Sequence, residues 1–441
     1  MFRRIESIAL SLLALSVLLR PDLAMAQARP TPPPAQTPPL SFLAAPFYLQ
    51  LAQVRGIAGP GPAPPMQTKS REEMRRFIEQ ELDRRYSPAR IEREKKGMAA
   101  WGLIPRDYDL RKLFLDLMEE QVAAYYDPRA KVMVVGDWLP TEAQQASLLH
   151  ELVHALQDHE TSLEAFLTPR PGQGDQLLAR QALVEGEAVG LMLDLLLQAQ
   201  GSSLTALPDL SQVRASVAAG TTGPVISAAP KFLRDLLVFP YLDGLEFVYQ
   251  FRKANPWSSM TALYQDPPRS TSQIMHPAKR LGPREDPVAV SLPDLGALGP
   301  GIAVVSEDEL GEFGLGAVLG PSLGEAAGRA AAEGWRGDRY RIWEDGDGFV
   351  LAYLVTFASP RLAEAFAANY ATIMEQRHTT VAGKRVAASD GALVTWQDGG
   401  RRFAVDRRGA DVLVLERMPA AMADQARESI WRARAQAAAK P

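Results

Sequence analysis

Apolar and polar residues repeat with a helical period through residues 141–160, and the period divides this segment into two faces. Thr141 and Gln144 form the pattern of a capping box, which predicts a helix that begins at Glu142. The apolar face holds Leu148, Leu149, Leu152, Val153 and Leu156. The opposite face holds Ser147, His150, Glu151, His154 and Asp158. The first face is expected to be buried and the second to line a hydrated space, unless this is an ordinary amphipathic helix with a solvated polar face.

A second helical pattern runs from about residue 175 to residue 200 and ends before Gly201. Its polar residues, among them Glu187, fall on one stripe that is expected to face solvent. Glu185 lies nearly opposite this stripe, among apolar residues, where a carboxylate is costly unless it is paired or bound to a metal. We therefore expect Glu185 to be functional and Glu187 to be a surface residue. Gly186 and Gly190 leave flat positions where another backbone can approach closely.

The polar face of the first helix carries the chemistry that metal binding needs. His150 and His154 lie four residues apart, one helical turn, which suits two imidazole ligands of one Zn²⁺ ion. Glu151 lies between them, in the position of a general base for a metal-activated water. Glu185 is the predicted third ligand. The alternative for Glu185 is a structural salt bridge with an arginine.

These two helices resemble the gluzincin, or thermolysin-like, zinc metallopeptidases. The chain is more similar to a little-characterised group of exported prokaryotic metallopeptidases, over roughly residues 70–285. The stretches that carry this similarity are Ala-Tyr-Tyr-Asp-Pro at 124–128, His-Glu-Leu-Val-His-Ala-Leu-Gln-Asp at 150–158, Ala-Leu-Val-Glu-Gly-Glu-Ala at 182–188 and His-Pro at 276–277. The resemblance implies zinc at His150, His154 and Glu185, with Glu151 as the base.

One position departs from the thermolysin-like pattern. Those enzymes have an aspartate four residues after the glutamate ligand, where it orients a ligand histidine, and this chain has Val189. Asp158 or Asp127 are candidates for the same role, although Asp158 is equally compatible with a plain exposed acid.

Residues 131–135 have the composition of a short strand just before the metal helix. Such a strand either forms a sheet edge on which an extended peptide substrate pairs, as in zincins, or is an ordinary strand of the sheet. Tyr125, Tyr126 and His276 are candidate donors to the developing oxyanion. His159 is expected to interact with the helix C-terminus and His378 to lie at the surface.

The N-terminus predicts export. Two arginines precede a short apolar run, and Ala-Met-Ala at 24–26 has the pattern of a signal-peptidase site, so a cleaved signal peptide at 1–26 and a periplasmic or secreted product are expected. No membrane span is expected after cleavage, because the apolar run is too short. The chain has no cysteine, which excludes thiolate ligands and a cysteine nucleophile. A net charge of −4 with mixed-charge helices argues against a nucleic-acid partner.

The remaining segments predict an α+β chain with two folded domains. Residues 27–66 form a proline-rich linker, in which the apolar stretch 42–52 is either a docking strand or part of the leader. A mainly helical zincin-like domain with a small sheet spans 67–285, a linker spans 286–300, and a smaller α+β accessory domain spans 301–441. In the accessory domain, Asp-Gly-Asp-Gly at 345–348 is predicted to be a hairpin turn between two strands, rather than a calcium loop.

The combined prediction is an exported zinc metallopeptidase that acts on peptides or proteins and binds one zinc ion. Two other classes remain open from the sequence: a catalytically silent zincin-fold binding protein, and an envelope scaffold protein in which zinc is structural. A closed four-ligand site, for example with His159 as the fourth ligand, is typical of structural zinc. The presence of Glu151 favours the enzyme, since a structural site has no need of a base.

Overall fold

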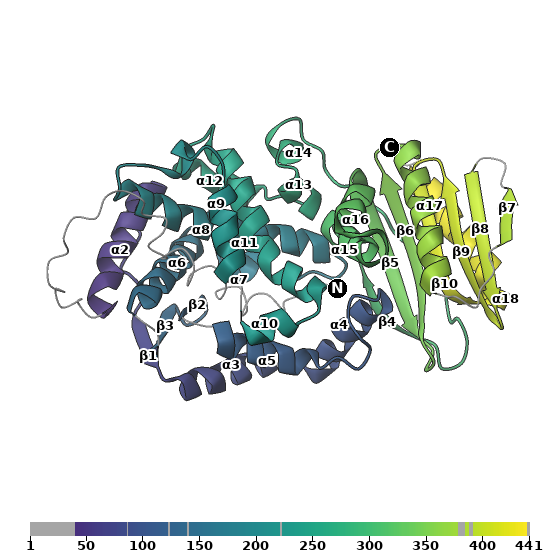
Figure 1. Ribbon diagram of the computed structural model, residues 1–441, viewed down its shortest axis with the longest axis horizontal. Coiled ribbons are helices and arrows are strands. Elements are labelled where there is room, and N and C mark those ends of the chain that lie inside the picture. Colours follow the sequence, from purple (N-terminus) through teal and green to yellow (C-terminus); the bar gives the residue numbers. More distant parts are fainter. Residues whose placement is uncertain are drawn as a thin grey trace.

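The computed structural model describes residues 40–85, 87–121, 124–138, 141–220, 223–377, 384–387 and 391–438. The predicted signal peptide, the first part of the proline-rich linker and His378 lie outside these residues. The described chain is an α+β protein, as predicted: a mainly helical N-terminal half with a three-stranded sheet is followed by a seven-stranded antiparallel sheet with its own helices (Figure 1). Among the described residues, no helix is both long enough and apolar enough to cross a membrane.

The N-terminal half is built around two long helices that were expected from the sequence. The metal helix is α6 (Thr141–Glu160), and the helix that carries Glu185 is α8 (Gly174–Gln198). A third long helix, α11 (Lys231–Arg252), packs along α8 (Figure 1). The other helices of this half are α2 (Leu40–Arg55), α3 (Arg71–Arg85), α4 (Pro88–Ala100), α5 (Leu110–Gln121), α7 (Leu163–Phe166), α9 (Ser211–Gly220), α10 (Pro224–Ala228), α12 (Met260–Gln265), α13 (Thr271–Met275) and α14 (Ala278–Leu281), with short 3₁₀ turns η2 (Leu204–Ala206) and η3 (Trp257–Ser259).

Helices α8 and α11 approach so closely that only glycine fits at their crossing. A Cβ atom on Gly186 would lie 2.2 Å from the carbonyl of Gly244, and one on Gly244 would lie 2.0 Å from the carbonyl oxygen of Ala182. The predicted close backbone approach is thus confirmed at Gly186. Gly190 instead faces the side chains of Trp257, Leu204 and Leu245.

The small sheet has the order β1 (Met66–Lys69), β3 (Val132–Gly136), β2 (Ala124–Asp127). The predicted strand at 131–135 corresponds to β3, which lies in the centre of this sheet, parallel to β1 and antiparallel to β2. The prediction that it forms a free edge for substrate is therefore wrong, because both of its edges are occupied by strands of the chain itself. The outer edge of β2 faces α6 instead, and Tyr126 on that edge donates its backbone N–H to Glu151.

The apolar stretch 42–52 belongs to α2, so neither the docking strand nor the leader segment expected from the sequence is found. Helix α2 packs on α6 and α8 (Figure 1). Tyr48, Leu51 and Ala52 are buried in this contact, whereas Phe42 and Leu49 point outward. The helix accommodates Pro46, which lies in its interior.

The C-terminal sheet has the order β4-β5-β6-β10-β9-β8-β7, and every pairing is antiparallel. Its strands are β4 (Ala303–Asp308), β5 (Trp335–Glu344), β6 (Phe349–Phe357), β7 (Lys384–Ala387), β8 (Gly391–Asp398), β9 (Arg401–Arg408) and β10 (Asp411–Pro419). Its helices are α15 (Gly311–Leu323), α16 (Glu325–Ala332), α17 (Pro360–Arg377) and α18 (Ala420–Ala438). Strand β6 shows why both faces are covered, since Leu351, Tyr353 and Val355 join one apolar core while Val350 and Leu354 join another.

The hairpin between β5 and β6 is the Asp-Gly-Asp-Gly turn predicted from the sequence. The N–H of Asp345 donates to the carbonyl of Gly348 at 3.2 Å, and the N–H of Gly348 donates back to the Asp345 carboxylate at 2.7 Å. Gly346 has a φ of 82°, a conformation that favours glycine.

The two halves of the molecule share one apolar core. Trp101, at the end of α4, packs edge-on against Tyr340 of β5 and Tyr353 of β6, with ring centroids 5.5 and 5.1 Å apart. Residues 286–300, predicted to be a linker, form no helix or strand, but they bury Val290, Leu292 and Leu298 in the second core beside α18.

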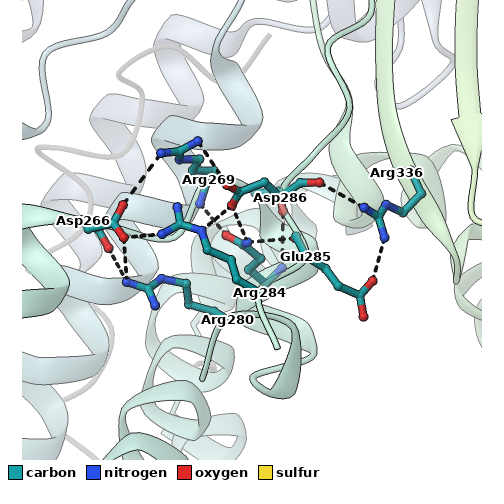
Figure 2. A network of polar contacts seen from close by, with 9 residues as sticks. Asp266, Arg269, Arg280, Arg284, Glu285, Asp286 and Arg336 are labelled. Atoms are coloured by element: carbon teal, nitrogen blue, oxygen red, sulfur yellow. Dashed lines mark hydrogen bonds and ion pairs between the residues drawn. The ribbon is translucent and has the colours of Figure 1, made fainter. Parts of the chain in front are cut away.

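A polar network reinforces the same junction. Asp266, after α12, pairs with Arg284, which also binds Asp286 at 2.7 Å, and Arg336 at the start of β5 reaches Glu285 at 2.7 Å (Figure 2). These side chains are partly exposed, so each pair contributes little by itself. Together they hold the α12–α14 segment against β5.

Candidate metal centre

Helix α6 presents the two histidines of the metal motif to the same point. Their Nε2 atoms lie 3.1 Å apart, and their rings are nearly perpendicular, with centroids 4.7 Å apart. Both side chains are buried, so the face that carries them is enclosed by protein and is not an ordinary solvated helix face.

Glu185 comes to the two histidines from the middle of α8. Its Oε2 atom lies 3.2 Å from Nε2 of His150, and its Oε1 atom lies 3.5 Å from Nε2 of His154. Ligands bound to one zinc ion at 2.0–2.1 Å in tetrahedral geometry lie about 3.3 Å from each other. The spacing of the three side chains is therefore close to that of the ligands of one zinc ion. The only ion-pair partners of Glu185 in the described structure are these histidines, which removes the alternative of a structural salt bridge with an arginine.

Glu185 and the two histidines shift the pKa values of one another. Burial lowers the pKa of His154, but the charge and hydrogen bond of Glu185, with smaller contributions from Glu151 and Gln157, together raise it to about 9. Burial lowers the pKa of His150. Burial opposes ionisation of Glu185, yet the charges and hydrogen bonds of His154 and His150 together lower the pKa of Glu185 below its ordinary value. The site thus holds a carboxylate beside a positive charge, which is the charge balance that a bound metal ion would take over.

Gln157 fixes the orientation of His154. The amide nitrogen of Gln157 donates to the carbonyl of Val184 at 2.9 Å and to Glu187 at 3.0 Å, and both of these are acceptors only. The amide oxygen of Gln157 is therefore the atom that faces Nδ1 of His154, at 2.8 Å, so Nδ1 carries the hydrogen. This tautomer leaves the lone pair of Nε2 directed at the metal position.

His150 is held differently. Its Nδ1 atom has no hydrogen-bond partner among the described residues, and its ring stacks on Tyr241 of α11 with centroids 6.1 Å apart. Packing, and not a hydrogen bond, orients this ligand.

The prediction that Glu187 is a surface residue is wrong. Its side chain is fully buried and accepts hydrogen bonds from Arg55, Gln157 and Tyr264. The prediction assumed that α8 has a solvent-facing stripe, whereas α6, α11, α2 and α13 surround this helix. Its polar residues are accommodated by partners from other parts of the chain, as Asp194 is by Trp257 of η3.

Neither aspartate proposed to orient a ligand histidine contacts one in the described structure. Asp158 is buried and accepts from the Tyr126 hydroxyl at 2.9 Å, from the N–H of Leu163 at 3.0 Å and from Lys131. Asp127 accepts from the backbone N–H groups of Arg129 and Ala130 in the turn after β2. The residue that performs this role is Gln157, and its spacing of three residues after His154 on an otherwise buried helix was the available signal.

Glu151 lies beside the metal position. Its carboxylate oxygen is within 4.8 Å of the ring nitrogens of His150 and His154, and its Oε2 atom accepts the backbone N–H of Tyr126 at 2.7 Å. His150, Glu151 and His154 form a group that can bind a metal ion. Glu185 contacts both histidines, which is consistent with a ligand role for Glu185 and a base role for Glu151.

The predicted oxyanion donors lie in different surroundings. Tyr126 belongs to the strand beside Glu151, and its hydroxyl donates to Asp158; burial, with Asp158 next, raises its pKa strongly. Tyr125 packs against Phe77, with ring centroids 5.7 Å apart. Nε2 of His276 lies 2.5 Å from Glu312 of α15, so among the described residues its side chain is engaged away from the histidine centre. His159 is exposed in the last turn of α6, as expected.

Two parts of the chain match known families. Residues 106–200 match peptidase M78, the IrrE N-terminal-like domain, and residues 302–427 match a domain of unknown function, DUF8575. The first match contains β2, β3, α6 and α8, and so all the residues of the metal centre. It indicates a metallopeptidase-like function and a peptidase-type hydrolase at a coarse level. No curated protein and no solved structure matches the chain.

Proposed function

We propose that this protein is an exported, zinc-dependent peptidase of gluzincin type that hydrolyses peptide bonds in peptides or proteins. The observation that carries the proposal is the arrangement of His150, His154 and Glu185 at the spacing of tetrahedral zinc ligands, with Glu151 beside them. Export rests on the sequence pattern of the first 26 residues.

The side chains divide the reaction between them. His150, His154 and Glu185 would hold one zinc ion, which supplies Lewis acidity to a water molecule and to the scissile carbonyl. Glu151 takes a proton from the attacking water and passes it to the leaving amine. The N–H of Tyr126 keeps the Glu151 carboxylate in place for both transfers. Tyr126 and His276 stay predictions as oxyanion donors. Tyr126 lies on the strand beside Glu151, whereas His276 binds Glu312, so Tyr126 is the donor that we favour.

The geometry gives less support to a structural zinc site. A structural site has four protein ligands, whereas His159, the candidate fourth ligand, is exposed at the end of α6. A catalytically silent binding protein has no use for a carboxylate held beside the metal position, and Glu151 is held there by a strand.

The proposal is tested by purifying the chain from Ala28 onward together with Glu151→Gln, measuring zinc per molecule, and assaying cleavage of a mixed peptide library. Both proteins are expected to bind about one zinc ion, and the variant is expected to lose about 10²–10⁴-fold in kcat. Zinc in both proteins with cleavage by neither would contradict the peptidase and favour the binding or scaffold function. Absence of zinc from the parent would contradict the metal centre itself.

A further inference from the structure

We propose that Arg55 of α2 is a positioning residue for the ligand His154, acting through Glu187 and Gln157. Helix α2 is then a part of the metal centre and not a pro-segment that can be removed. The inference rests on the proposed zinc centre, and it assigns a role to a helix outside the matched residues 106–200.

The contacts form a continuous chain from α2 to the metal position. Arg55 donates from Nε to Oε1 of Glu187, and Nη1 of the same guanidinium donates to the carbonyl of Trp257 at 2.7 Å. Oε2 of Glu187 accepts from Gln157 at 3.0 Å, and Gln157 faces Nδ1 of His154 at 2.8 Å. All four side chains are buried, so water does not compete for these bonds.

The direction of the hydrogen bonds follows from the positions of the acceptors around Gln157. Its amide nitrogen donates to Oε2 of Glu187 and to the carbonyl of Val184, which turns the amide oxygen towards Nδ1 of His154. If the amide flipped, its nitrogen would face Nδ1 of His154, and the hydrogen of the ring would have to move to Nε2. A histidine protonated at Nε2 has no lone pair there for the metal.

Arg55 holds the Glu187 carboxylate in place, because its Nε donates to Oε1 and leaves Oε2 to accept from Gln157. A buried carboxylate without a cationic partner carries a large cost. Among the described residues, Arg55 is the only cation that forms an ion pair with Glu187. Tyr264 adds a second hydrogen bond to Oε2 of Glu187 but brings no charge.

The first test measures the zinc dissociation constant by competition with a chromophoric chelator. Outer-shell partners of metal ligands typically contribute about 10–100-fold in affinity. Gln157→Leu is expected to weaken zinc binding by this full factor, and Arg55→Met by about tenfold. A chain that begins at Gly56 is expected to bind zinc at least as weakly as Arg55→Met. Zinc binding by Arg55→Met and by the shortened chain that equals the parent would overturn the inference.

A matched control separates positioning from general packing. Arg252 of α11 lies over the same Trp257, with its guanidinium carbon 4.5 Å from the ring centre, and has no bond to Glu187. Arg252→Met is expected to leave zinc affinity within about twofold of the parent, since no outer-shell bond to a ligand is lost. An equal loss in Arg252→Met and Arg55→Met would assign the effect to packing around Trp257 and overturn the inference.

A second variant keeps the test decisive if Arg55→Met folds poorly. Replacing both members of a buried ion pair by apolar residues often preserves stability. The pair Arg55→Met with Glu187→Leu is therefore expected to fold, as judged by the thermal melting of the zinc-free protein, and still to bind zinc about tenfold more weakly. Parent-like zinc affinity in this folded variant would overturn the inference. These results do not depend on hydrolysis, so loss of the peptidase proposal would be recognised separately, as tight zinc binding without cleavage.

Discussion

The middle and the N-terminal end of α8 both carry buried acids, but the two places surround them differently. In the middle, Glu185 faces two histidines and Glu187 faces an arginine. At the N-terminal end, Asp175 faces two further acids, Glu309 from the turn after β4 and Asp338 from β5, and Glu309 in turn faces Asp308 of β4. The comparison teaches that burial of a carboxylate does not by itself indicate a metal site. The neighbouring side chains decide whether a buried acid can bind a metal, and of the two places only the middle of α8 has histidine nitrogens beside the acid.

Two of the acids at the N-terminal end, Asp308 and Glu309, cap α8. The residue before α8, Gln173, provides no side-chain cap. The carboxylate of Asp308 accepts the N–H of Gly174 at 2.9 Å, and Glu309 accepts the N–H of Gln176 at 3.4 Å. The C-terminal half of the molecule thus caps the helix that carries Glu185, where orphan N–H groups and the helix dipole favour negative charge.

The largest effect that the comparison predicts is on zinc affinity. Glu185→Gln is expected to weaken zinc binding by more than the about 10–100-fold that outer-shell partners contribute, since a direct ligand is lost. Asp175→Asn, on the same helix, is expected to leave zinc affinity unchanged, because Asp175 binds Thr271 and no histidine. Isothermal titration of both variants with zinc checks this. Equal losses would show that the two ends of α8 are not separate in function.

A smaller effect is expected on stability at the crossing of α8 and α11. Gly186→Ala places a methyl group against the backbone of Gly244 and is expected to destabilise the fold by about 1–3 kcal/mol. Gly190→Ala, one turn away, meets the side chain of Trp257 at 3.2 Å, which can adjust, and alanine favours the helix by about 1 kcal/mol. Urea denaturation distinguishes them. A Gly186→Ala protein as stable as Gly190→Ala would contradict the close approach of these backbones.

The acids at the N-terminal end predict a dependence of stability on pH. Burial, followed by the charge of Asp338, raises the pKa of Glu309 to about 8, against the partial opposition of Arg339, and burial raises the pKa of Asp338 to about 6. Between about pH 4 and these values, the folded protein holds protons that the unfolded chain has released. The free energy of unfolding therefore falls as pH rises through this window.

Glu309→Gln removes the main titrating group and is expected to flatten this profile, raising Tm at pH 8 by roughly 1–2 °C relative to the parent. The matched control is Glu307→Gln, two residues earlier, where the glutamate is exposed and pairs with Arg341. Differential scanning calorimetry across about pH 5–9, a range that includes the folded-state pKa values of Glu309 and Asp338, measures the Tm of both variants. A parent whose stability rises with pH over this range would contradict the prediction.

The smallest expected effect concerns His276. Its bond to Glu312 joins α13 to α15, so His276→Gln is expected to change kcat/KM by less than about threefold while costing about 1.5–3 kcal/mol of stability. A loss of about 10²–10³-fold in kcat would instead identify it as an oxyanion donor, as its place in the sequence suggested. Steady-state kinetics and thermal melting, measured on the same preparation, decide between them.

The sequence predicted what depends on local periodicity. The extents of α6 and α8, the hairpin at 345–348 and the pairing of glycine with a close helix crossing all follow from short-range patterns. The convergence of Glu185 on the two histidines also followed, because an acid on an apolar face requires a partner.

Errors arose where partners come from distant parts of the chain. Glu187 could not be distinguished from a surface acid, because its cation, Arg55, lies 132 residues away. The central position of β3 depends on β1, which starts at the boundary between the predicted linker and the predicted zincin-like domain, where no strand was predicted. The N-terminal cap of α8 comes from Asp308, 134 residues later. The hydrophobic period and the composition of a short segment do not reveal contacts with residues so far away in the sequence.

The packing of Trp101 against Tyr340 and Tyr353 has a consequence for the order in which the protein matures. During synthesis, a chain that has been made only to residue 300 already contains every residue of the metal centre. It still lacks the two tyrosines that cover Trp101 and the carboxylates that cap the Glu185 helix. We expect such a nascent chain to hold metal poorly, so that a hydrolase arises only when β4, β5 and β6 have been made.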